Sequence, residues 1–309
     1  MRVADLSDAE LRAALQGDGL DIRTGPFACR IRSELPDIAD NIGLLYADQP
    51  LGQSDEFIDF DVRIAPPRGL RRWWRPQVLF RYDDWVPFKP LPADQAVPML
   101  EWGLNWCVSS HAHQYLILHA AVLEKDGRAL IFPAPPGSGK STLCAALACH
   151  GWRLLSDELG LIDLQDGHCH GLARPVNLKN RSIDVLQERL PEAVFSRPFR
   201  DTAKGTVALM RPPEESVRRA AEPAMPGWIV SVRYEAGART HFKACGKGRM
   251  FMQVANTAFN YILLAQRGFR SLGQLVRTSD CYELVYSDLD DVLALFDRLE
   301  PPETREVAG

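Results

Sequence analysis

The sequence has no long apolar run. Nowhere in its 309 residues do about eighteen apolar residues follow one another, which is the length that a membrane-spanning helix requires. Residues 1–20 carry acidic side chains where a secretory signal has an uninterrupted apolar segment. Both absences favour a cytoplasmic protein that does not enter a membrane.

Basic runs are also missing. The formal net charge is −4, and both signs of charge are spread along the chain. Such a chain offers no broad basic surface, so we expect neither nucleic acid nor an anionic membrane as the main partner. The composition, with 46% hydrophobic and 25% charged residues, allows one large domain or two moderate ones.

Paired cysteines are absent as well. The seven cysteines are scattered and form no Cys-x-x-Cys pair, which argues against a zinc site and against a disulfide framework. We therefore expect reduced, mostly buried thiols. The triplet His168-Cys169-His170 lies beside a turn at Asp166-Gly167, and alternation in a strand puts both histidines on one face. We do not expect a metal there.

Internal repeats and low-complexity tracts are not found either, so the organisation has to be read from local patterns. Over residues 1–92, short strand-like runs alternate with proline-rich breaks, which indicates a small accessory α+β domain. Apolar positions at helical spacing over 93–112 lead into a second domain, which we place at 93–300. Residues 301–309 are expected to form a flexible tail.

Two apolar, β-prone runs, 115–124 and 128–132, flank the tripeptide Lys-Asp-Gly at 125–127. Asp-Gly between such runs is a strong hairpin signal. With Asp and Gly as the two loop residues, the numbers of paired residues sum to 253. His119 then lies opposite Ala134, at the start of the loop that carries the chemistry.

Residues 134–141 read APPGSGKS, follow an apolar strand and precede a run that suits a helix, which is the context of a Walker A loop. The glycines let backbone N–H groups turn toward phosphate oxygens, the helix N-terminus adds partial positive charge, and Lys140 reaches the β and γ phosphates. Ser141 is then a ligand of Mg²⁺. The residues expected to contact ATP are Pro136, Gly137, Ser138, Gly139, Lys140, Ser141 and Thr142.

The loop departs from the Walker A pattern at its start. Ala134 replaces the first glycine, and Pro135 and Pro136 remove possible N–H donors. The alternative interpretation is a Gly-Ser-Gly turn that joins a strand to a helix and binds nothing. The Gly-Lys-Ser sequence at the junction of the two elements favours phosphate binding.

A short apolar strand over 152–155 follows the helix and ends in Ser156-Asp157-Glu158. The helix rises by roughly 17 Å and a strand of about five residues returns over the same distance, so the acidic pair comes back to the level of the phosphates. A right-handed crossover lays this strand parallel to the strand before the loop. There Asp157 and Glu158 can hold Mg²⁺, or Asp157 can take the proton of an attacking hydroxyl. The alternative is a solvated Asp-Glu turn.

The remaining chain predicts a sheet that is covered by helices on both faces. We expect strands over 228–234, 240–243 and 282–286, and a final helix capped by Asp288. A single helix is expected over 248–265. The positions expected to face inward are Phe251, Val254, Ala255, Ala258, Phe259 and Ile262.

The order of these residues resembles the C-terminal catalytic domain of HPr kinase/phosphorylase. The shared features are a strand with His119, a hairpin, Gly-Ser-Gly-Lys-Ser-Thr, a helix, a strand at 150–155 and an acidic turn at 156–158. Over 113–298 the chain looks more closely like the HPr-kinase-related proteins of biosynthetic gene neighbourhoods. The resemblance implies an α/β fold of the HPr kinase and PEP carboxykinase type, with a central mixed sheet flanked by helices. It does not extend to the small α+β domain expected over residues 1–92.

The resemblance also implies roles for single residues. Lys140 and the loop amides bind ATP, and Ser141 binds Mg²⁺ together with the acidic pair. Asp157 is the base toward a hydroxyl of the substrate. His119 matches the family's histidine near the active site, where it steers the acidic pair or senses phosphate.

The segment after the acidic pair departs from the family. Glu158 replaces the second aspartate, and residues 173–180 replace a glycine-rich segment. We therefore carry over neither phosphorolysis nor HPr itself as the substrate. Arg174 and Lys204 are cations that can clamp a transferring phosphoryl group, and each is equally plausible as a solvated loop charge.

The function that these residues favour is an ATP-dependent kinase. It transfers the γ-phosphoryl group to a hydroxyl, with a serine of a protein or peptide as the expected acceptor and with ATP and Mg²⁺ as cofactors. Two alternatives use the same loop: a nucleotide hydrolase, and an ATP-binding regulatory subunit of a peptide-modifying system that transfers no phosphate. A homo-oligomer stays open, since the family's members form rings.

Overall fold

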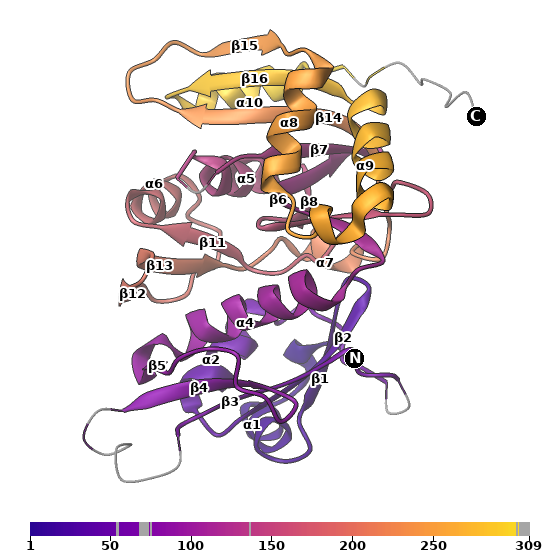
Figure 1. Cartoon of the computed structure of the whole chain (residues 1–309). Coiled ribbons are helices and arrows are strands. Elements are labelled where there is room, and N and C mark those ends of the chain that lie inside the picture. Colours follow the sequence, from indigo (N-terminus) through magenta and orange to yellow (C-terminus); the bar gives the residue numbers. More distant parts are fainter. Residues whose placement is uncertain (54–55, 68–73, 75, 136, 301, 303–309) are drawn as a thin grey trace. The chain divides into compact units, whose positions relative to one another are not determined.

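A computed structural model describes the chain except for residues 54–55, 68–73, 75, 136, 301 and 303–309. The chain folds as an α/β protein of helices and open mixed sheets (Figure 1). It is divided into two compact units. The first unit comprises Met1–Val108 and Asn177–Arg218, and the second comprises Ser109–Val176 and Arg219–Gly309.

This division differs from the boundary expected between residues 92 and 93. Helix α4 (Ala96–His111) belongs to the first unit over most of its length. The segment Asn177–Arg218 also belongs there, although it lies in the middle of the expected second domain. Sequence patterns describe neighbouring residues, whereas the return of this segment to the first unit depends on long-range packing.

A five-stranded sheet in the order β1-β2-β3-β4-β5 forms the first part of the first unit. Its strands are β1 Leu20–Thr24, β2 Phe27–Ser33, β3 Phe60–Ala65, β4 Gln77–Tyr82 and β5 Leu91–Pro92. Helices α1 (Asp8–Gln16) and α2 (Pro36–Leu45) accompany it, as do the 3₁₀ turns η1 (Val3–Asp5) and η2 (Ala93–Gln95). Helix α1 begins where Ser7 and Glu10 form a reciprocal capping box.

The returning segment adds a three-stranded sheet to the first unit, in the order β11-β13-β12. Its elements are β11 Val176–Lys179, α6 Arg181–Arg189, β12 Phe199–Thr202, β13 Gly205–Met210 and α7 Glu214–Arg218. Arg211 donates through Nε to Oδ2 of Asp48 over 2.9 Å, and Arg197 forms an ion pair with Asp37. These bonds tie the returning segment to the N-terminal part of the chain.

An eight-stranded mixed sheet is the centre of the second unit. The strand order is β10-β9-β6-β7-β14-β16-β15, and β8 pairs with β6. The strands are β6 Tyr115–Lys125, β7 Arg128–Pro133, β8 Arg153–Ser156, β9 Leu159–Asp163, β10 Cys169–His170, β14 Met225–Tyr234, β15 His241–Ala244 and β16 Asp280–Tyr286. Because β7, β14 and β16 are parallel, their ends at Pro133, Tyr234 and Tyr286 share one edge, where open α/β sheets bind ligands.

The hairpin of β6 and β7 confirms the expected register. Ala120 pairs with Pro133 and Lys125 pairs with Arg128, so each pair sums to 253. The loop residues have positive φ angles of 52° and 76°, as a type I′ turn requires. The part of β6 before Ala120 therefore extends beyond the end of β7 and lies beside the loop that follows β7.

The strand after α5 has the expected direction but is not a neighbour of β7. Both β8 and β9 pair antiparallel with β6, and β6 lies between them and β7. The expected end of a strand at Asp157-Glu158 is instead a short interruption between β8 and β9, and both strands follow β6. The carboxyl ends of β7 and β8 still meet at one edge, because both strands are antiparallel to β6.

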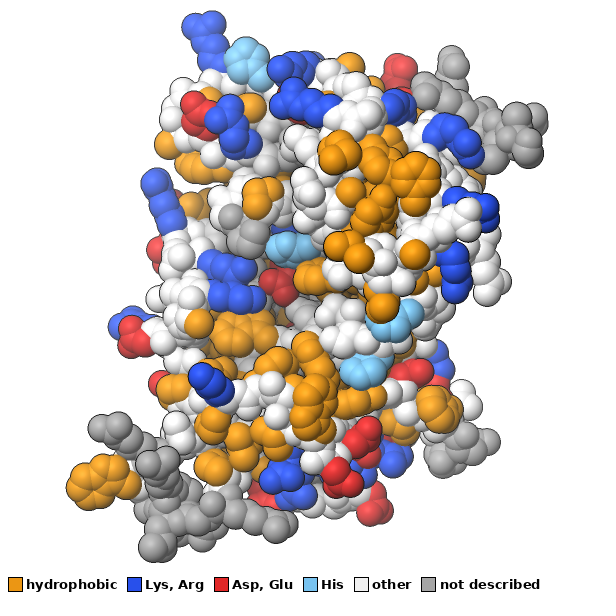
Figure 2. Space-filling model, viewed as in Figure 1, with side chains coloured by type: hydrophobic (Ala, Val, Ile, Leu, Met, Phe, Trp, Pro, Cys, Tyr) orange, Lys and Arg blue, Asp and Glu red, His pale blue; other side chains and the backbone are white. Residues whose placement is uncertain are grey.

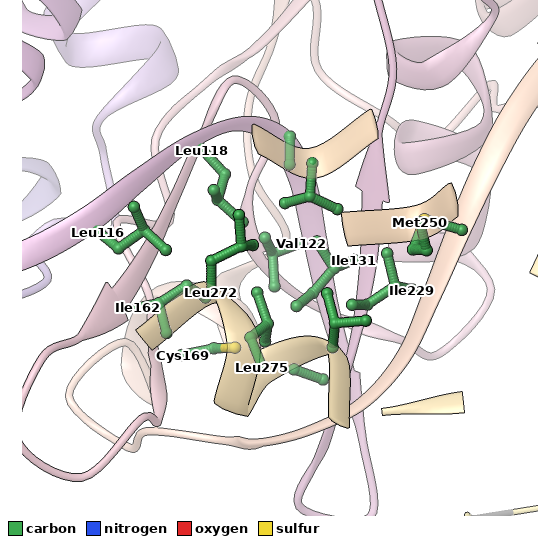
Figure 3. Packing of buried hydrophobic residues seen from close by; sticks show 14 of the residues in the cluster. Leu116, Leu118, Val122, Ile131, Ile162, Cys169, Ile229, Met250, Leu272 and Leu275 are labelled. Carbon is green, nitrogen blue, oxygen red and sulfur yellow. The ribbon is translucent and has the colours of Figure 1, made fainter. Parts of the chain in front are cut away.

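Helices cover both faces of this sheet, as expected. Helices α8 (Lys247–Thr257) and α9 (Tyr261–Thr278) pack on the face that carries Leu118, Val122 and Ile131 (Figure 3). Helices α5 (Lys140–Cys149) and α10 (Leu289–Asp297) lie on the other face, where the Phe132 ring is 5.8 Å from the Phe296 ring. Asp288 caps α10, as predicted, by accepting hydrogen bonds from the first amides of the helix.

The single helix expected over 248–265 is wrong. Helix α8 ends at Thr257 and helix α9 begins at Tyr261. As a result Phe259 and Ile262, which were expected to face inward, are exposed.

Within the described ranges, no helix combines the length and the apolar character that crossing a membrane requires.

The break between α8 and α9 is caused by bonds to strand β6. The side chain of Asn260 accepts a hydrogen bond from the Ile117 N–H over 3.0 Å and donates one to the Tyr115 carbonyl over 2.8 Å. Ala258 forms an antiparallel β-bridge with Leu118. The junction thus extends the sheet beside β6, where β7 has already ended, and the helical pattern is interrupted by tertiary contacts.

Candidate functional site

The loop between β7 and α5 has the backbone of a phosphate-binding turn. Gly137 and Gly139 have φ angles of 84° and 88°, which lie in the left-handed region that favours glycine. Gly139 is the N-cap of α5 and no side chain caps this helix end. Pro136, expected to contact the nucleotide, lies outside the described residues.

Two tyrosines from the neighbouring parallel strands hold the loop. The hydroxyl of Tyr286 donates to the carbonyl of Gly139 over 3.0 Å, and the Tyr234 N–H donates to the carbonyl of Ser138 over 2.8 Å. A Cβ on Gly139 would lie 2.7 Å from the Tyr286 hydroxyl and 2.8 Å from Cβ of Tyr234. Burial raises the pKa of Tyr286, so its phenol keeps the proton that it donates.

Three features of the loop fit a bound phosphate. The first hydrogen bond of α5 runs from the Leu143 N–H to the Gly139 carbonyl over 3.0 Å, so the amides of the preceding turn have no acceptor within the helix. A Cβ on Gly137 would meet no atom within 4 Å, which leaves the loop open on that side. Ser141 and Thr142 are half-buried on the first turn of α5. Amides at a helix N-terminus bind anions.

Ala134, the departure from the Walker A pattern, causes no visible distortion. Its side chain is fully buried, and the residue is not among those with a positive φ. The backbone at this position therefore needs no glycine, and the methyl group packs in the core. The turn itself is made by Gly137 and Gly139, which the sequence retains.

One face of α5 carries Lys140 and the buried thiol of Cys144. Cys144 follows Lys140 by one helical turn on the same face of α5, and its Sγ lies 4.0 Å from the carbonyl oxygen of Ser156. Burial raises the pKa of the Cys144 thiol, the negative charge of Asp157 raises it further, and the positive charge of Lys140 lowers it. The face of α5 that begins with Lys140 therefore packs on the strand end that carries Asp157.

Both charged side chains are removed from water. Lys140 is 5% exposed and Asp157 is 4% exposed. In such surroundings a charge interacts more strongly with a ligand than it does at the surface. Buried groups of opposite charge at the edge where the parallel strands of an α/β sheet end are typical of a binding or catalytic site.

The strand register separates Asp157 from Glu158. Val122 pairs with Ser156 and His119 pairs with Leu159, so the register is the same before and after the acidic pair. Side chains alternate across the pair, which puts Asp157 on the face of His119, the face that α5 covers. Glu158, expected as a further metal ligand, falls on the opposite face.

His119 lies on the same face as Asp157, one residue before the first pair of β6 with β7. It is half-buried, and its ring lies 5.7 Å from the ring of Phe259 at the junction of α8 and α9. The register thus brings His119 to the edge of the sheet where the loop begins, as the sequence predicts. The contact with Phe259 is a feature that the sequence did not suggest.

Of the two expected clamp cations, Arg174 belongs to the second unit and Lys204 to the first. Arg174 is 6% exposed and follows two residues, Leu172 and Ala173, whose amides both donate to the carbonyl of Leu155. The segment before Arg174 therefore crosses the end of β8, beside Asp157. Lys204 lies 4.8 Å from the ring centroid of Trp102, within the first unit.

A group of possible metal ligands lies elsewhere in the second unit. Asp163, Asp166 and His170 have ligand atoms within 4.8 Å of one another. Both carboxylates also accept hydrogen bonds from backbone amides of their own hairpin, from Gln165 over 2.6 Å and from His168 over 2.8 Å. These bonds hold the two carboxylates in the turn, and Cys169, which precedes His170, belongs to the buried core.

The second unit therefore combines a glycine loop, a buried lysine and a buried aspartate at one sheet edge. The sequence analysis identified Lys140, Ser141 and Asp157 as site residues. It missed Tyr234 and Tyr286, because their contacts with the loop join residues far apart in the chain. The chain matches no family model and no curated protein.

Proposed function

We propose that this chain is an ATP-dependent kinase of the P-loop type that resembles HPr kinase, acting on a hydroxyl of a protein or peptide. The observation that carries the proposal is the packing of the α5 face with Lys140 and Cys144 against the end of β8 that leads to Asp157, directly after a left-handed glycine turn. Phosphoryl transfer needs positioning, a cation and a base, and these residues offer all three.

When bound, ATP supplies the γ-phosphoryl group and Mg²⁺ neutralises charge on its oxygens. The amides that start α5 bind phosphate oxygens, and Lys140 contributes its charge at the first turn of the helix. Ser141 offers a hydroxyl and Asp157 a carboxylate as oxygen ligands, which are the ligands that Mg²⁺ prefers. Tyr286 donates to the carbonyl of Gly139, and this bond would hold the loop in place around the phosphates.

Asp157 also serves as the base in this proposal. Its carboxylate would accept the proton of the acceptor hydroxyl and become a neutral carboxyl group. In the same step the acceptor oxygen would bond to the γ-phosphorus, the bond from this phosphorus to the β–γ bridging oxygen would break, and ADP would leave. His119 lies on the same face and orients the acceptor or the carboxylate. Arg174, buried beside the end of β8, stabilises the transferring group. Lys204 stays a predicted clamp that belongs to the first unit.

Two substitutions test the roles of the charged pair. Lys140→Ala should abolish binding of a fluorescent ATP analogue, since it removes the cation at the loop. Asp157→Asn should spare binding and lower the transfer rate by about 10²- to 10⁴-fold, the usual contribution of a general base. The control is Asp163→Asn, which removes a carboxylate from the hairpin of β9 and β10. It should change neither nucleotide binding nor the transfer rate. An Asp157→Asn protein with full activity would contradict the assignment of the base.

A labelling experiment separates the kinase from its alternatives. Purified protein is incubated with γ-labelled ATP and a lysate of its own host, beside the Asp157→Asn variant. Label that enters a discrete species only with the unchanged protein supports transfer to an acceptor. Release of free phosphate alone supports a hydrolase. Nucleotide binding without turnover supports a regulatory subunit. Either result would contradict the kinase proposal.

A further inference from the structure

Large hydrophobic side chains are concentrated on the outer side of α8 and α9 (Figure 2). Five of the twelve that are exposed in the described part of the chain lie within residues 252–269. They are Met252, Phe259, Ile262, Leu263 and Phe269, with exposed fractions of 60%, 54%, 90%, 66% and 59%. We call them the α8–α9 apolar surface. Apolar groups that gather in this way mark an interaction site more often than scattered ones do.

The surface is held in place by the structure below it. The ring of Phe251 lies 5.5 Å from the ring of Phe269 and 6.5 Å from that of Tyr261, so the two helices are joined by aromatic contacts. Ala265 interrupts α9 with φ 48° and ψ −122°, a conformation that costs an alanine energy. Ile262 and Leu263, which precede this break, are the two most exposed members of the surface.

The charge of this region has one sign. Residues 246–279 contain no aspartate or glutamate and five basic residues: Lys247, Arg249, Arg267, Arg270 and Arg277. Arg249 pairs with Glu283, and Lys247 donates to the carbonyl of Ser279. The other three are exposed arginines of α9 that form no ion pair with any described residue. A partner for this surface therefore has to bring negative charge as well as apolar groups.

The apolar surface continues to the candidate active site. Phe259, one of its members, is the residue whose ring lies 5.7 Å from the ring of His119. The Phe259 N–H also donates to the carbonyl of Ile117 over 2.8 Å, so this end of the surface is fixed to strand β6. A chain that lies along α9 toward Phe259 is thus led to the sheet edge that carries the glycine loop.

We propose that the α8–α9 apolar surface binds an acidic, apolar segment of the protein that carries the acceptor hydroxyl. This inference rests on the proposed kinase function and names the partner class of the same site. A second copy of the chain fits less well, because a symmetric contact would bring the unpaired arginines together. An anionic membrane fits less well. Polybasic membrane sites have about four to eight basic residues, whereas two of the five basic residues here are engaged by Glu283 and the Ser279 carbonyl, which leaves three.

The test is a selection of binding peptides by the full-length protein. A random library of 16-residue peptides displayed on phage is selected on the unchanged protein, and the winners are measured as free labelled peptides. We expect net negative winners with apolar residues at i, i+3 and i+4. Phe269→Ser and Arg270→Glu should each weaken their binding by about tenfold or more, as loss of a main contact does. The matched controls are Met225→Ser and Arg298→Glu, which replace exposed residues outside the surface. Both should leave peptide binding unchanged.

The outcomes separate this inference from the kinase proposal. Peptide binding needs no turnover, so Asp157→Asn should bind the winners as well as the unchanged protein does. Winners without acidic bias, or winners that bind Phe269→Ser and Arg270→Glu equally well, would overturn the docking site even if transfer occurs. Binding to phosphatidylserine vesicles that Arg270→Glu abolishes, or self-association that Phe269→Ser abolishes, would assign the surface to a membrane or to a second copy instead.

Discussion

Two glycines of the loop share a backbone conformation but differ in what surrounds them. A methyl group on Gly139 would collide with Tyr234 and Tyr286, whereas one on Gly137 would meet nothing within 4 Å. Gly137→Ala should therefore lower the free energy of unfolding only by the cost of a positive φ, about 1 kcal/mol. Gly139→Ala should cost more and should also weaken ATP binding. Urea unfolding and nucleotide titration of both variants measure this, and equal losses would mean that the contact with the tyrosines is unimportant.

At the scale of residues, the sequence predicted what a local motif contains. Lys140 and Ser141 follow from the Gly-Lys-Ser string, and Asp157 follows from the length of a helix and a returning strand. Tyr286 could not be found in this way, because it lies 147 positions from Gly139 and bonds to a carbonyl, which every residue has. A motif does not reveal a contact to the backbone.

Strands β6 and β8 are joined by a buried ion pair. Glu124, 3% exposed, accepts a hydrogen bond from Nε of Arg153 and another from the Gly127 N–H over 2.6 Å. Glu124→Gln should lower the free energy of unfolding by about 3–5 kcal/mol, because Arg153 would keep a buried charge without its partner. Urea unfolding of the full chain measures the loss.

The control for this prediction lies in the same neighbourhood. Glu222 pairs with Arg219 over 2.7 Å, but its side chain is 55% exposed. Glu222→Gln should change the free energy of unfolding by less than about 1 kcal/mol, as is usual for surface pairs. If both variants lose the same amount, burial does not determine the strength of the Glu124 pair.

For helices and strands, the predictions from the sequence were correct where contacts between neighbouring residues determine the structure. The Asp-Gly turn fixed the register of β6 and β7, and Asp288 marked the start of α10. The prediction of one helix over 248–265 was wrong because the Asn260 side chain forms hydrogen bonds with the backbone of β6, which lies more than 140 positions earlier in the chain. Apolar periodicity gives no sign of such a bond.

For the chain taken together, the two compact units differ from the domains that the sequence predicts. The sequence places a domain at 93–300, yet a fragment of these residues would contain α4 and 177–218 without the rest of the first unit. We expect it to be insoluble or to expose hydrophobic surface that binds a fluorescent dye, while the full chain does not. A soluble fragment that unfolds cooperatively would contradict the division.

The interleaved order of the segments also has a consequence during synthesis. Residues 109–176 leave the ribosome before the first unit is finished at residue 218 and before β14, at 225–234, can pair with β7. Until then the nascent chain carries a β-hairpin with one open, apolar edge, which is a template for aggregation. Slower translation at low temperature prolongs that exposure, so chaperones that shield strand edges should matter for the yield of this protein more than its modest size suggests.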